Sequence, residues 1–417
     1  MYNNRNNNNY QQKGRFGKGR GNNGGNKRYV QGRKRYFENR FHKDPVFTEI
    51  PEAFTPVEGV MRRNDKGPIL RKPENSFKPE GGEIYIRQEL VRRYGLIQGS
   101  YIKGRMVEVD GQKWVYEIDS VNDLLPEIFR FRPQLTELPA VSPTERFDLS
   151  ASGDETMRIV DLIAPIGKGT RALIVSPPKA GKTTILEKLA SSIKQVSPES
   201  HVIVLLVDER PEEVTQFRRN LPNVDVLASC NDQTPKEHVE LVRATMDTVK
   251  VELECGRDVV ILLDSITRTG RAFNLNNVYS NRLLSGGLAP GAMEIPRRFF
   301  GMARKIENGG SLTMIATALI DTGSRMDELI FQEFKGTGNC EIVLDRNLAE
   351  SRIFPAINAY SSGTRREELL YNEKDYAKIV TLRRILADES VKDAASTLKE
   401  LVERYKTNKE LLASLRV

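Results

Sequence analysis

Residues 173–184, with the sequence LIVSPPKAGKTT, limit what this chain can fold into more than any other stretch. A run of Leu, Ile and Val ends at two prolines, and Gly181-Lys182-Thr183 then opens a segment with helical spacing of apolar residues. A strand, a tight loop and a helix in this order are typical of a phosphate-binding loop, whose backbone N–H groups face an anion. We expect Lys182 to reach the outer phosphates and Thr183 to offer its hydroxyl to Mg²⁺.

The loop departs from the usual pattern G-x-x-x-x-G-K-[ST] at one position, because Ser176 stands where the first glycine belongs. Gly181, at which the backbone has to approach a phosphate closely, is present. The alternative is an ordinary strand, turn and helix with a chance Gly-Lys-Thr. Further parts of a nucleotide site are needed to decide between the two.

The sequence around this loop predicts a parallel β-sheet covered by helices on both faces, the α/β class. Short continuous runs of Val, Ile and Leu alternate there with segments of helical spacing, which is typical of a buried parallel sheet. From residue 373 onward the pattern is helical. The predicted strands are 173–175, 202–207, 224–227, 259–263, 312–318 and 341–344.

Two of the predicted strands end in acidic residues. The run 259–263 delivers Asp264, a carboxylate placed to support the same Mg²⁺ as Thr183. The run 202–207 is followed by Asp208-Glu209-Arg210, and Glu209 is the candidate to orient and deprotonate an attacking water. An ion pair at a strand end is the alternative for each carboxylate.

Phosphoryl transfer also needs a positive charge where negative charge develops in the transition state. Residues 361–369, SSGTRREEL, present two arginines after a glycine turn, beyond the last predicted strand. An arginine so placed can reach outward. A solvated pair of surface arginines is the alternative.

Length and composition fit a globular chain of two or three domains. The chain has 417 residues, 39% of them hydrophobic, without a run of about 20 apolar residues or an apolar signal segment. We therefore expect a cytoplasmic protein with no membrane contact. Three cysteines and three histidines are scattered without the spacing of a disulfide framework or a zinc site.

Positive charge is concentrated at the N-terminus. Residues 1–43 hold 12 of the 64 Lys and Arg residues and one of the 56 acidic residues, which leaves 52 basic against 55 acidic side chains elsewhere. Asn, Gly, Arg and Lys with interleaved aromatics predict a disordered tail over residues 1–45, of a composition that neutralises phosphates and stacks on unpaired bases. A solubilising tail is the alternative.

Between the tail and the sheet, about five strand-like segments predict a closed β-barrel of the oligonucleotide-binding (OB-fold, cold-shock-like) type over residues 46–124. A linker with several prolines over 125–150 leads to an ATPase domain over 151–417. Tyr85, Trp114 and Tyr116 lie on predicted strands of the barrel. They either face outward, where they can stack on RNA bases, or fill the barrel core.

Several motifs together resemble the bacterial transcription termination factor Rho family. The resemblance runs from about residue 54 to the C-terminus, and the motif set is specific to this family rather than to RecA-like ATPases in general. The PPKAGKT form of the loop also resembles the family's own version. The motifs are 207–215 (VDERPEEVT), 263–268 (LDSITR), 297–301 (RRFFG), 316–324 (ATALIDTGS), 333–339 (EFKGTGN) and 362–365 (SGTR).

The resemblance implies a RecA-like ATPase that forms a homohexamer, with ATP bound between subunits and single-stranded RNA in the centre. It also implies ATP-dependent 5′→3′ translocation, RNA/DNA unwinding and termination of transcription, with the RNA polymerase elongation complex as partner. Arg365 would act in catalysis across the subunit interface beside Arg352, together with Glu209 and Lys182 of the neighbouring site. The residues implied to bind ATP and Mg²⁺ are Lys179, Ala180, Gly181, Lys182, Thr183, Thr184, Arg210, Asp264 and Phe354.

RNA contacts are implied in two central loops, residues 275–290 and 321–327, and in the barrel. In the barrel, residues 67–71 (GPILR) lack the aromatics of the family's Gly-Phe-Gly-Phe-Leu-Arg strand, which leaves the RNA sequence preference open. The tail stands where the family usually has an N-terminal helical bundle. The implied RNA-binding residues are Tyr85, Trp114, Arg282, Gly286, Gly287 and Arg325, the last where the family commonly has Lys.

Two other classes of function are compatible with parts of the sequence. One is an RNA-binding protein whose ATPase fold has lost catalysis, against which Lys182, Glu209, Asp264 and Arg365 speak. The other is a RecA-like subunit of a rotary ATPase, against which the basic tail and the barrel speak. RNA-stimulated ATP hydrolysis is the measurement that separates the three.

Overall fold

The computed structural model describes residues 44–45, 54–277 and 287–415 of the chain. Residues 1–43 of the predicted tail, and Arg282 and Gly286 of the predicted RNA loop, lie outside the described residues. The described residues from 54 onward, apart from 65–67, belong to one compact unit.

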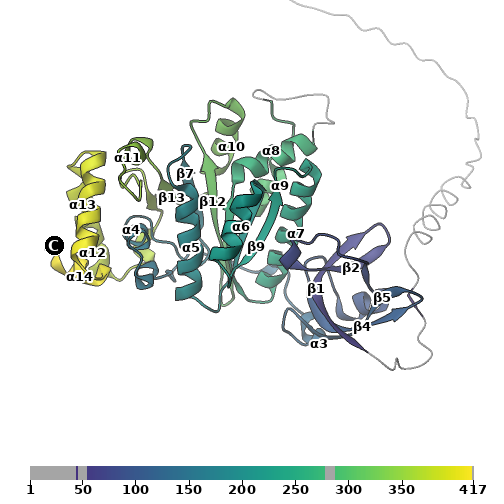
Figure 1. The fold of residues 1–417 in the computed structure, drawn as a ribbon. Coiled ribbons are helices and arrows are strands. Elements are labelled where there is room, and N and C mark those ends of the chain that lie inside the picture. Colours follow the sequence, from purple (N-terminus) through teal and green to yellow (C-terminus); the bar gives the residue numbers. More distant parts are fainter. Residues whose placement is uncertain (1–43, 46–53, 278–286, 416–417) are drawn as a thin grey trace, which may run out of the picture. The chain divides into compact units, whose positions relative to one another are not determined.

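A closed five-stranded β-barrel opens the described chain, as the sequence predicts (Figure 1). Its strands follow the order β1-β2-β3-β5-β4, and β3 and β5 form a parallel pair. A short helix, α2 (Gln88–Tyr94), which the strand pattern did not predict, links β3 to β4. The strands are β1 (Thr55–Asn64), β2 (Gly67–Arg71), β3 (Ile84–Ile86), β4 (Tyr101–Val109) and β5 (Gln112–Val121).

Alternation along the strands separates the two faces of the barrel wall. Leu70, Ile86 and Val115 belong to the barrel core, whereas their neighbours along the strands form a separate small cluster on the opposite face. Gly104 lies where the β4–β5 register shifts, and a Cβ there would be 2.2 Å from the carbonyl oxygen of Glu117. Only glycine fits at this point of the barrel wall.

A large, mostly parallel sheet follows the barrel, with the strand order β14-β13-β7-β12-β10-β8-β9. All six predicted strands are present and parallel, so the α/β class is confirmed. Three very short antiparallel strands, β6, β11 and β14, are too short to show a sequence pattern and were not predicted. The strands are β6 (Ala140–Val141), β7 (Arg171–Ser176), β8 (His201–Glu209), β9 (Asp225–Cys230), β10 (Asp258–Asp264), β11 (Arg304–Ile306), β12 (Ser311–Leu319), β13 (Cys340–Val343) and β14 (Gly363–Thr364).

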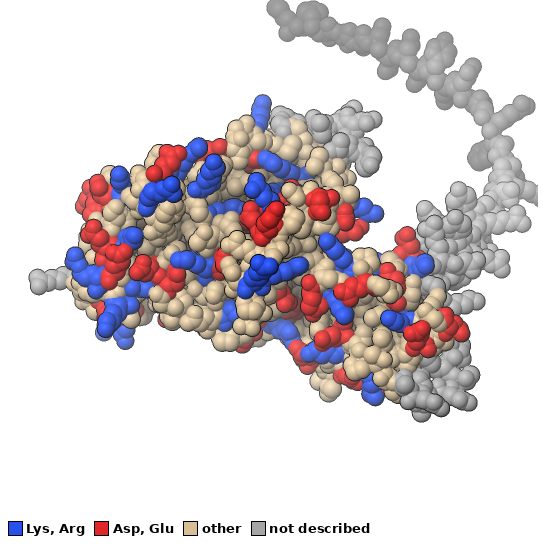
Figure 2. Space-filling model, viewed as in Figure 1, with Lys and Arg blue, Asp and Glu red and all other residues tan. Residues whose placement is uncertain are grey.

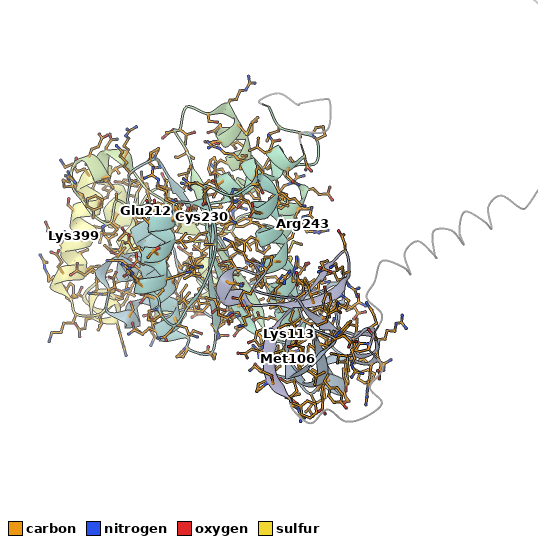
Figure 3. The ribbon with its side chains drawn as sticks, turned by 45° about the vertical axis from the view of Figure 1, so that its right-hand side comes forward. Met106, Lys113, Glu212, Cys230, Arg243 and Lys399 are labelled. Carbon is orange, nitrogen blue, oxygen red and sulfur yellow. The ribbon has the colours of Figure 1, made fainter. Side chains whose placement is uncertain are left out.

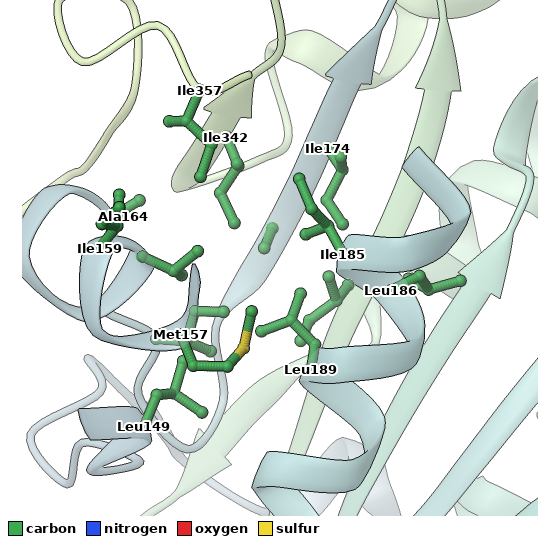
Figure 4. Close-up of a cluster of buried hydrophobic side chains, with 14 of the residues drawn as sticks. Leu149, Met157, Ile159, Ala164, Ile174, Ile185, Leu186, Leu189, Ile342 and Ile357 are labelled. Carbon is green, nitrogen blue, oxygen red and sulfur yellow. The ribbon is translucent and has the colours of Figure 1, made fainter. Parts of the chain in front are cut away.

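Helices cover both faces of the sheet, because alternate residues of the buried strands point to two separate hydrophobic cores. One core contains residues of α4, α5, α6 and the C-terminal helices, and Figure 4 shows Ile185 and Leu189 of α5 beside Ile174 of β7. The other core contains residues of α7, α8, α9 and α10. These helices are α4 (Glu155–Ile163), α5 (Lys182–Val196), α6 (Pro211–Asn220), α7 (Pro235–Glu254), α8 (Ile266–Asn276), α9 (Glu294–Gly301), α10 (Arg325–Lys335), α12 (Glu373–Ala387), α13 (Val391–Arg404) and α14 (Asn408–Ser414).

The remaining elements are short connections. They are α3 (Pro126–Phe129), α11 (Arg346–Glu350) and the 3₁₀ turns η1 (Pro73–Asn75), η2 (Leu135–Glu137), η3 (Leu149–Ser152) and η4 (Glu367–Leu369).

Strand β9 lies at one end of the strand order, so one of its sides has no neighbouring strand among the residues that the structure describes. Side-chain oxygens occupy two backbone donors of this strand. The N–H of Ala228 donates to Ser76 Oγ at 2.8 Å, and the N–H of Cys230 donates to Gln233 Oε1 at 2.8 Å.

Charged side chains of both signs are intermixed over the face shown in Figure 2. No helix in the described part of the chain is both long and apolar enough to cross a membrane.

Candidate active site

The loop between β7 and α5 has the geometry of a phosphate-binding loop. Strand β7 ends at Ser176 and α5 begins at Lys182, as predicted. Gly181 precedes the helix with φ at 90°, a left-handed conformation that glycine adopts without steric cost, and Lys179 also has a positive φ of 66°. The first backbone N–H groups of α5 have no acceptor within the helix and face the loop. They can therefore donate to a bound phosphate.

Lys182, at the start of α5, and Asp264, at the end of β10, form an ion pair. The Lys182 ammonium nitrogen lies 2.5 and 2.6 Å from the two carboxylate oxygens of Asp264. Thr317, on the strand between β7 and β10, donates its hydroxyl to Asp264 Oδ1 at 2.9 Å. The structure therefore brings together the lysine and the aspartate that the sequence placed in one site.

Glu209 ends β8 beside this pair and is almost completely buried, with 1% of its surface exposed. Its Oε1 accepts hydrogen bonds from Arg268 Nη1 at 3.0 Å and from the backbone N–H of Arg210 at 3.1 Å. Its Oε2 is buried and has no hydrogen-bond partner among the described residues. Burial raises the pKa of Glu209, the Arg268 guanidinium lowers it and the Asp264 charge raises it again, with a net increase.

A pocket of roughly 570 Å³ lies beside the loop. The Phe354 side chain is 44% exposed, and its ring carbons come within 3.9 Å of the point that a Cβ on Gly181 would occupy. Lys399 of α13, labelled in Figure 3, lines the same pocket. The lining residues are Gly153, Asp154, Glu155, Thr156, Ile159, Ala180, Gly181, Thr184, Ile185, Lys188, Phe354, Pro355, Ala356 and Lys399.

The donor set at the start of α5 fits Mg²⁺. The hydroxyl of Thr183 and the carboxylate of Asp264 are oxygen ligands, which this cation prefers, and it needs few of them because it keeps several waters. Asp264 is fully buried, so its charge is costly unless a cation accompanies it, and in this structure Lys182 is that cation.

Arg365 lies at the opposite end of the strand order from Glu209. It directly follows β14, two strands beyond β7, whereas β10 and β8 lie on the other side of β7. Its side chain is exposed, and its backbone N–H donates to the carbonyl of Asn339 at 2.8 Å. Arg352 and Arg210 are also exposed. The strand order thus separates Arg365 from Glu209 within one chain.

Two of the predicted RNA-binding residues in the barrel, Tyr85 and Trp114, lie side by side. Their ring centroids are 5.2 Å apart, on adjacent strands β3 and β5. They belong to a small cluster that is separate from the barrel core, and both are buried, with 6% and 4% of their surface exposed. Stacking on bases remains a prediction for both.

The described parts of the two predicted central loops approach each other. Gly287 has a φ of 82°, and a Cβ there would lie 3.4 Å from the terminal methyl of Met326. Arg325 begins α10 and is exposed. Behind it, Asp327 is buried and accepts hydrogen bonds from Arg271 at 2.8 Å and from Thr322 at 2.7 Å.

Sequence reasoning gave no role to Arg268 and Thr317, although both lie in the quoted motifs. Arg268 lies four residues after Asp264, in the first turn of α8, and this closeness to the end of β10 is the one signal that its side chain can reach the site. Thr317 is found only when β12 is known to pair with β10, which the sequence does not show.

Glu209 is buried beside the Lys182–Asp264 pair with a raised pKa and a carboxylate oxygen that no described residue hydrogen-bonds, which is the arrangement of a general base that activates a water molecule. Beside a phosphate-binding loop on a parallel sheet, it defines a RecA-like P-loop ATPase. Residues 156–364 match the family described as ATP synthase alpha/beta family, nucleotide-binding domain. An ATPase of the type III secretion system of pathogenic bacteria shares the fold, with a TM-score of 0.56 and 19% identity over 74% of this chain and 92% of that one.

Comparison with curated proteins narrows this class. The transcription termination factor Rho of Aquifex aeolicus is 46% identical over 86% of this chain and 84% of its own length. The Rho proteins of Streptobacillus moniliformis and Pseudomonas aeruginosa are 44% and 45% identical, over 90% and 84% of this chain and 93% and 84% of their own lengths. The chain belongs to the transcription termination factor Rho family.

Proposed function

We propose that the protein is an RNA-dependent ATPase of the cytoplasm that moves 5′→3′ along single-stranded RNA, unwinds RNA/DNA duplexes and ends transcription by RNA polymerase. Family membership supports this, and the observation that carries it is the buried Glu209 beside the Lys182–Asp264 pair. A buried carboxylate with a raised pKa beside a nucleotide site is typical of a catalytic group.

The hydrolytic step follows from the positions of the side chains. Lys182 pairs with Asp264 in this structure and, when ATP binds, turns toward its β- and γ-phosphates. Glu209 holds the attacking water through its unpartnered Oε2 and accepts its proton, for which a raised pKa is an advantage. Arg268 keeps the carboxylate in place through Oε1.

Mg²⁺ bound by Thr183 and Asp264 would neutralise charge on the phosphates. Phe354 would stack on the base, in the pocket beside Gly181. Lys179, Ala180 and Thr184 belong to the same loop and helix start, and Arg210 immediately precedes α6.

Arg365 would complete the site of a neighbouring subunit in a homohexamer. Its exposed side chain at the β14 edge supports this, because the strand order leaves it too far along the sheet to meet Glu209 of its own chain. RNA would bind through the tail, the barrel face with Tyr85 and Trp114, and the central loops with Arg282, Gly286, Gly287 and Arg325. The RNA polymerase elongation complex would be the partner on which translocation acts.

ATP hydrolysis with and without single-stranded RNA tests the proposal. RNA should raise the turnover of the wild-type protein strongly, and Glu209→Gln should bind ATP but lose about 100- to 10,000-fold in kcat, because the amide cannot accept a proton. A rate of ATP hydrolysis that RNA does not change would favour a rotary-type ATPase. Hydrolysis by Glu209→Gln near the wild-type rate would remove Glu209 from its role.

A further inference from the structure

Strand β8 carries one extra residue immediately before Glu209. Val207 pairs with Ser229 and Glu209 pairs with Cys230, so Asp208 has no counterpart on β9. Asp208 has a φ of 57°, in the left-handed region that non-glycine residues rarely adopt. Side chains alternate between the two faces of a regular strand, so without the extra residue Glu209 would point to the same face of the sheet as Val207. The bulge interrupts this alternation and changes the direction of the Glu209 side chain. The direction of the Glu209 side chain therefore depends on the conformation of Asp208.

Three groups hold Asp208 in this conformation. Ser229 Oγ accepts the backbone N–H of Asp208 at 3.4 Å, and the Arg268 guanidinium donates to the Asp208 carbonyl. The Asp208 carboxylate lies 3.8 Å from Nε2 of His238. The backbone N–H, the backbone carbonyl and the carboxylate of Asp208 thus each have a partner.

His238 is buried and contacts both Ser229 and Asp208. It is 5% exposed, on the first turn of α7, and its Nδ1 lies 2.8 Å from Ser229 Oγ. Its position is fixed by the helix start, where Thr234 and Glu237 exchange capping hydrogen bonds. Burial lowers the pKa of His238, with the Asp208 charge opposing, so the neutral imidazole is favoured.

One tautomer of the neutral imidazole satisfies all of these contacts. In it Ser229 Oγ accepts from the Asp208 N–H and donates its own proton to Nδ1. The ring proton of this tautomer is on Nε2 and faces the Asp208 carboxylate. Each contact is attractive in this tautomer, and together they oppose relaxation of Asp208 to an ordinary extended conformation.

We propose that His238 and Ser229 are positioning residues for ATP hydrolysis, which act through Asp208 to aim the Glu209 carboxylate. The inference rests on the proposed role of Glu209. Neither residue contacts the phosphate-binding loop in the structure as described, so their loss should affect the chemical step and leave ATP binding intact.

Three substitutions of His238 separate its two contacts. His238→Asn keeps a polar atom near the place of Nδ1, His238→Gln keeps one near the place of Nε2, and His238→Ala removes both. Since Nδ1 makes the short contact, we expect His238→Ala and His238→Gln to lower kcat about 10- to 100-fold, the usual effect of a misplaced catalytic group. We expect His238→Asn to stay within about fivefold of the wild type, and KM for ATP to change less than about twofold in all three.

Ser229→Ala gives an independent test with a smaller change. It should lower kcat as His238→Ala does, and the double substitution should be no worse than either single one, because both act through the same contact. If His238→Ala does not fold, Ser229→Ala and His238→Asn still decide the question.

His201 provides the matched control at the other end of β8. Its ring nitrogens lie 2.8 Å from Glu252 and 2.9 Å from Asp225, so His201→Ala removes both contacts of a hydrogen-bonded histidine of this part of the sheet, as His238→Ala does. It should lower the melting temperature and leave kcat unchanged. Melting temperature and ADP affinity, measured for every variant, report the structural effects.

Wild-type kcat in both His238→Ala and Ser229→Ala would overturn the inference. So would a His238→Asn variant as slow as His238→Ala, because a positioning role through Nδ1 requires the rescue. Glu209→Gln is measured alongside. If it retains hydrolysis, the proposed function of Glu209 fails; if it is inactive while the His238 and Ser229 variants are normal, the inference alone fails.

Discussion

Replacing Arg268 by alanine should move the pH dependence of ATP hydrolysis. Arg268 Nη1 lies 3.0 Å from Glu209 Oε1, and its charge opposes the rise in the pKa of Glu209 that burial causes. An opposite charge within about 4 to 6 Å typically lowers a carboxyl pKa by about 1 to 3 units, so its removal should raise the pKa by a similar amount. Glu209 works as a base only when ionised. The acidic limb of the kcat profile should therefore move about 1 to 3 pH units upward in Arg268→Ala.

The assay is kcat against pH at saturating ATP and RNA. Arg268→Lys keeps the positive charge and should shift the acidic limb much less than Arg268→Ala. Acidic limbs that superimpose for the wild type and Arg268→Ala would refute the argument, since either Glu209 is not the titrating group or Arg268 does not control it.

The free energy of unfolding should also depend on pH through the pKa of Glu209. The pKa of Glu209 is raised in the folded protein above its ordinary value of 4.5, so its contribution to stability is fully present below that value and is lost as the pH rises through the folded-state pKa. Arg268→Ala should extend this loss to higher pH, and adding Glu209→Gln should abolish the extension. Melting temperatures at several pH values measure it.

The remaining predictions concern the subunit interface, the base pocket and the tail. Inactive Arg365→Ala subunits mixed with inactive Lys182→Ala subunits should regain ATP turnover, because some interfaces then pair an intact loop with an intact arginine; no recovery despite subunit exchange contradicts the trans role. Phe354→Ala should weaken ATP binding about tenfold, measured by titration, because base stacking on an aromatic ring is worth about 1 to 3 kcal/mol, while kcat should change little. Deleting residues 1–43 should flatten the slope of log K for RNA against log[salt] by roughly 3, if a third of the 12 basic residues each neutralise one phosphate. Superimposable slopes would mean that the tail does not bind RNA.

The sequence predicted the parts of the fold that repeat a pattern. Six buried strands were visible as runs of branched apolar residues, and the acids that end two of them gave Glu209 and Asp264. The short strands β6, β11 and β14 of the large sheet were missed because two or three residues are too few to show a periodicity.

Contacts between elements far apart in the sequence were harder to predict. Thr317 reaches Asp264 only through the pairing of β12 with β10, and register cannot be read from one strand alone. His238 looked like one of three scattered histidines, because the bulge at Asp208 that gives it a neighbour appears only when β8 and β9 are paired. The position of Tyr85 and Trp114 on the barrel was undecidable for the same reason.

The two occupied donors on β9 matter for how copies of this chain can meet. A bare strand edge invites a second chain to pair with it, and pairing that does not close on itself grows into fibres. With the N–H groups of Ala228 and Cys230 already bonded to Ser76 and Gln233, a foreign strand would have to displace two hydrogen bonds before making any. Edge-to-edge pairing of β9 between copies of the chain is therefore disfavoured at high protein concentration. Contacts between copies then depend on complementary side chains.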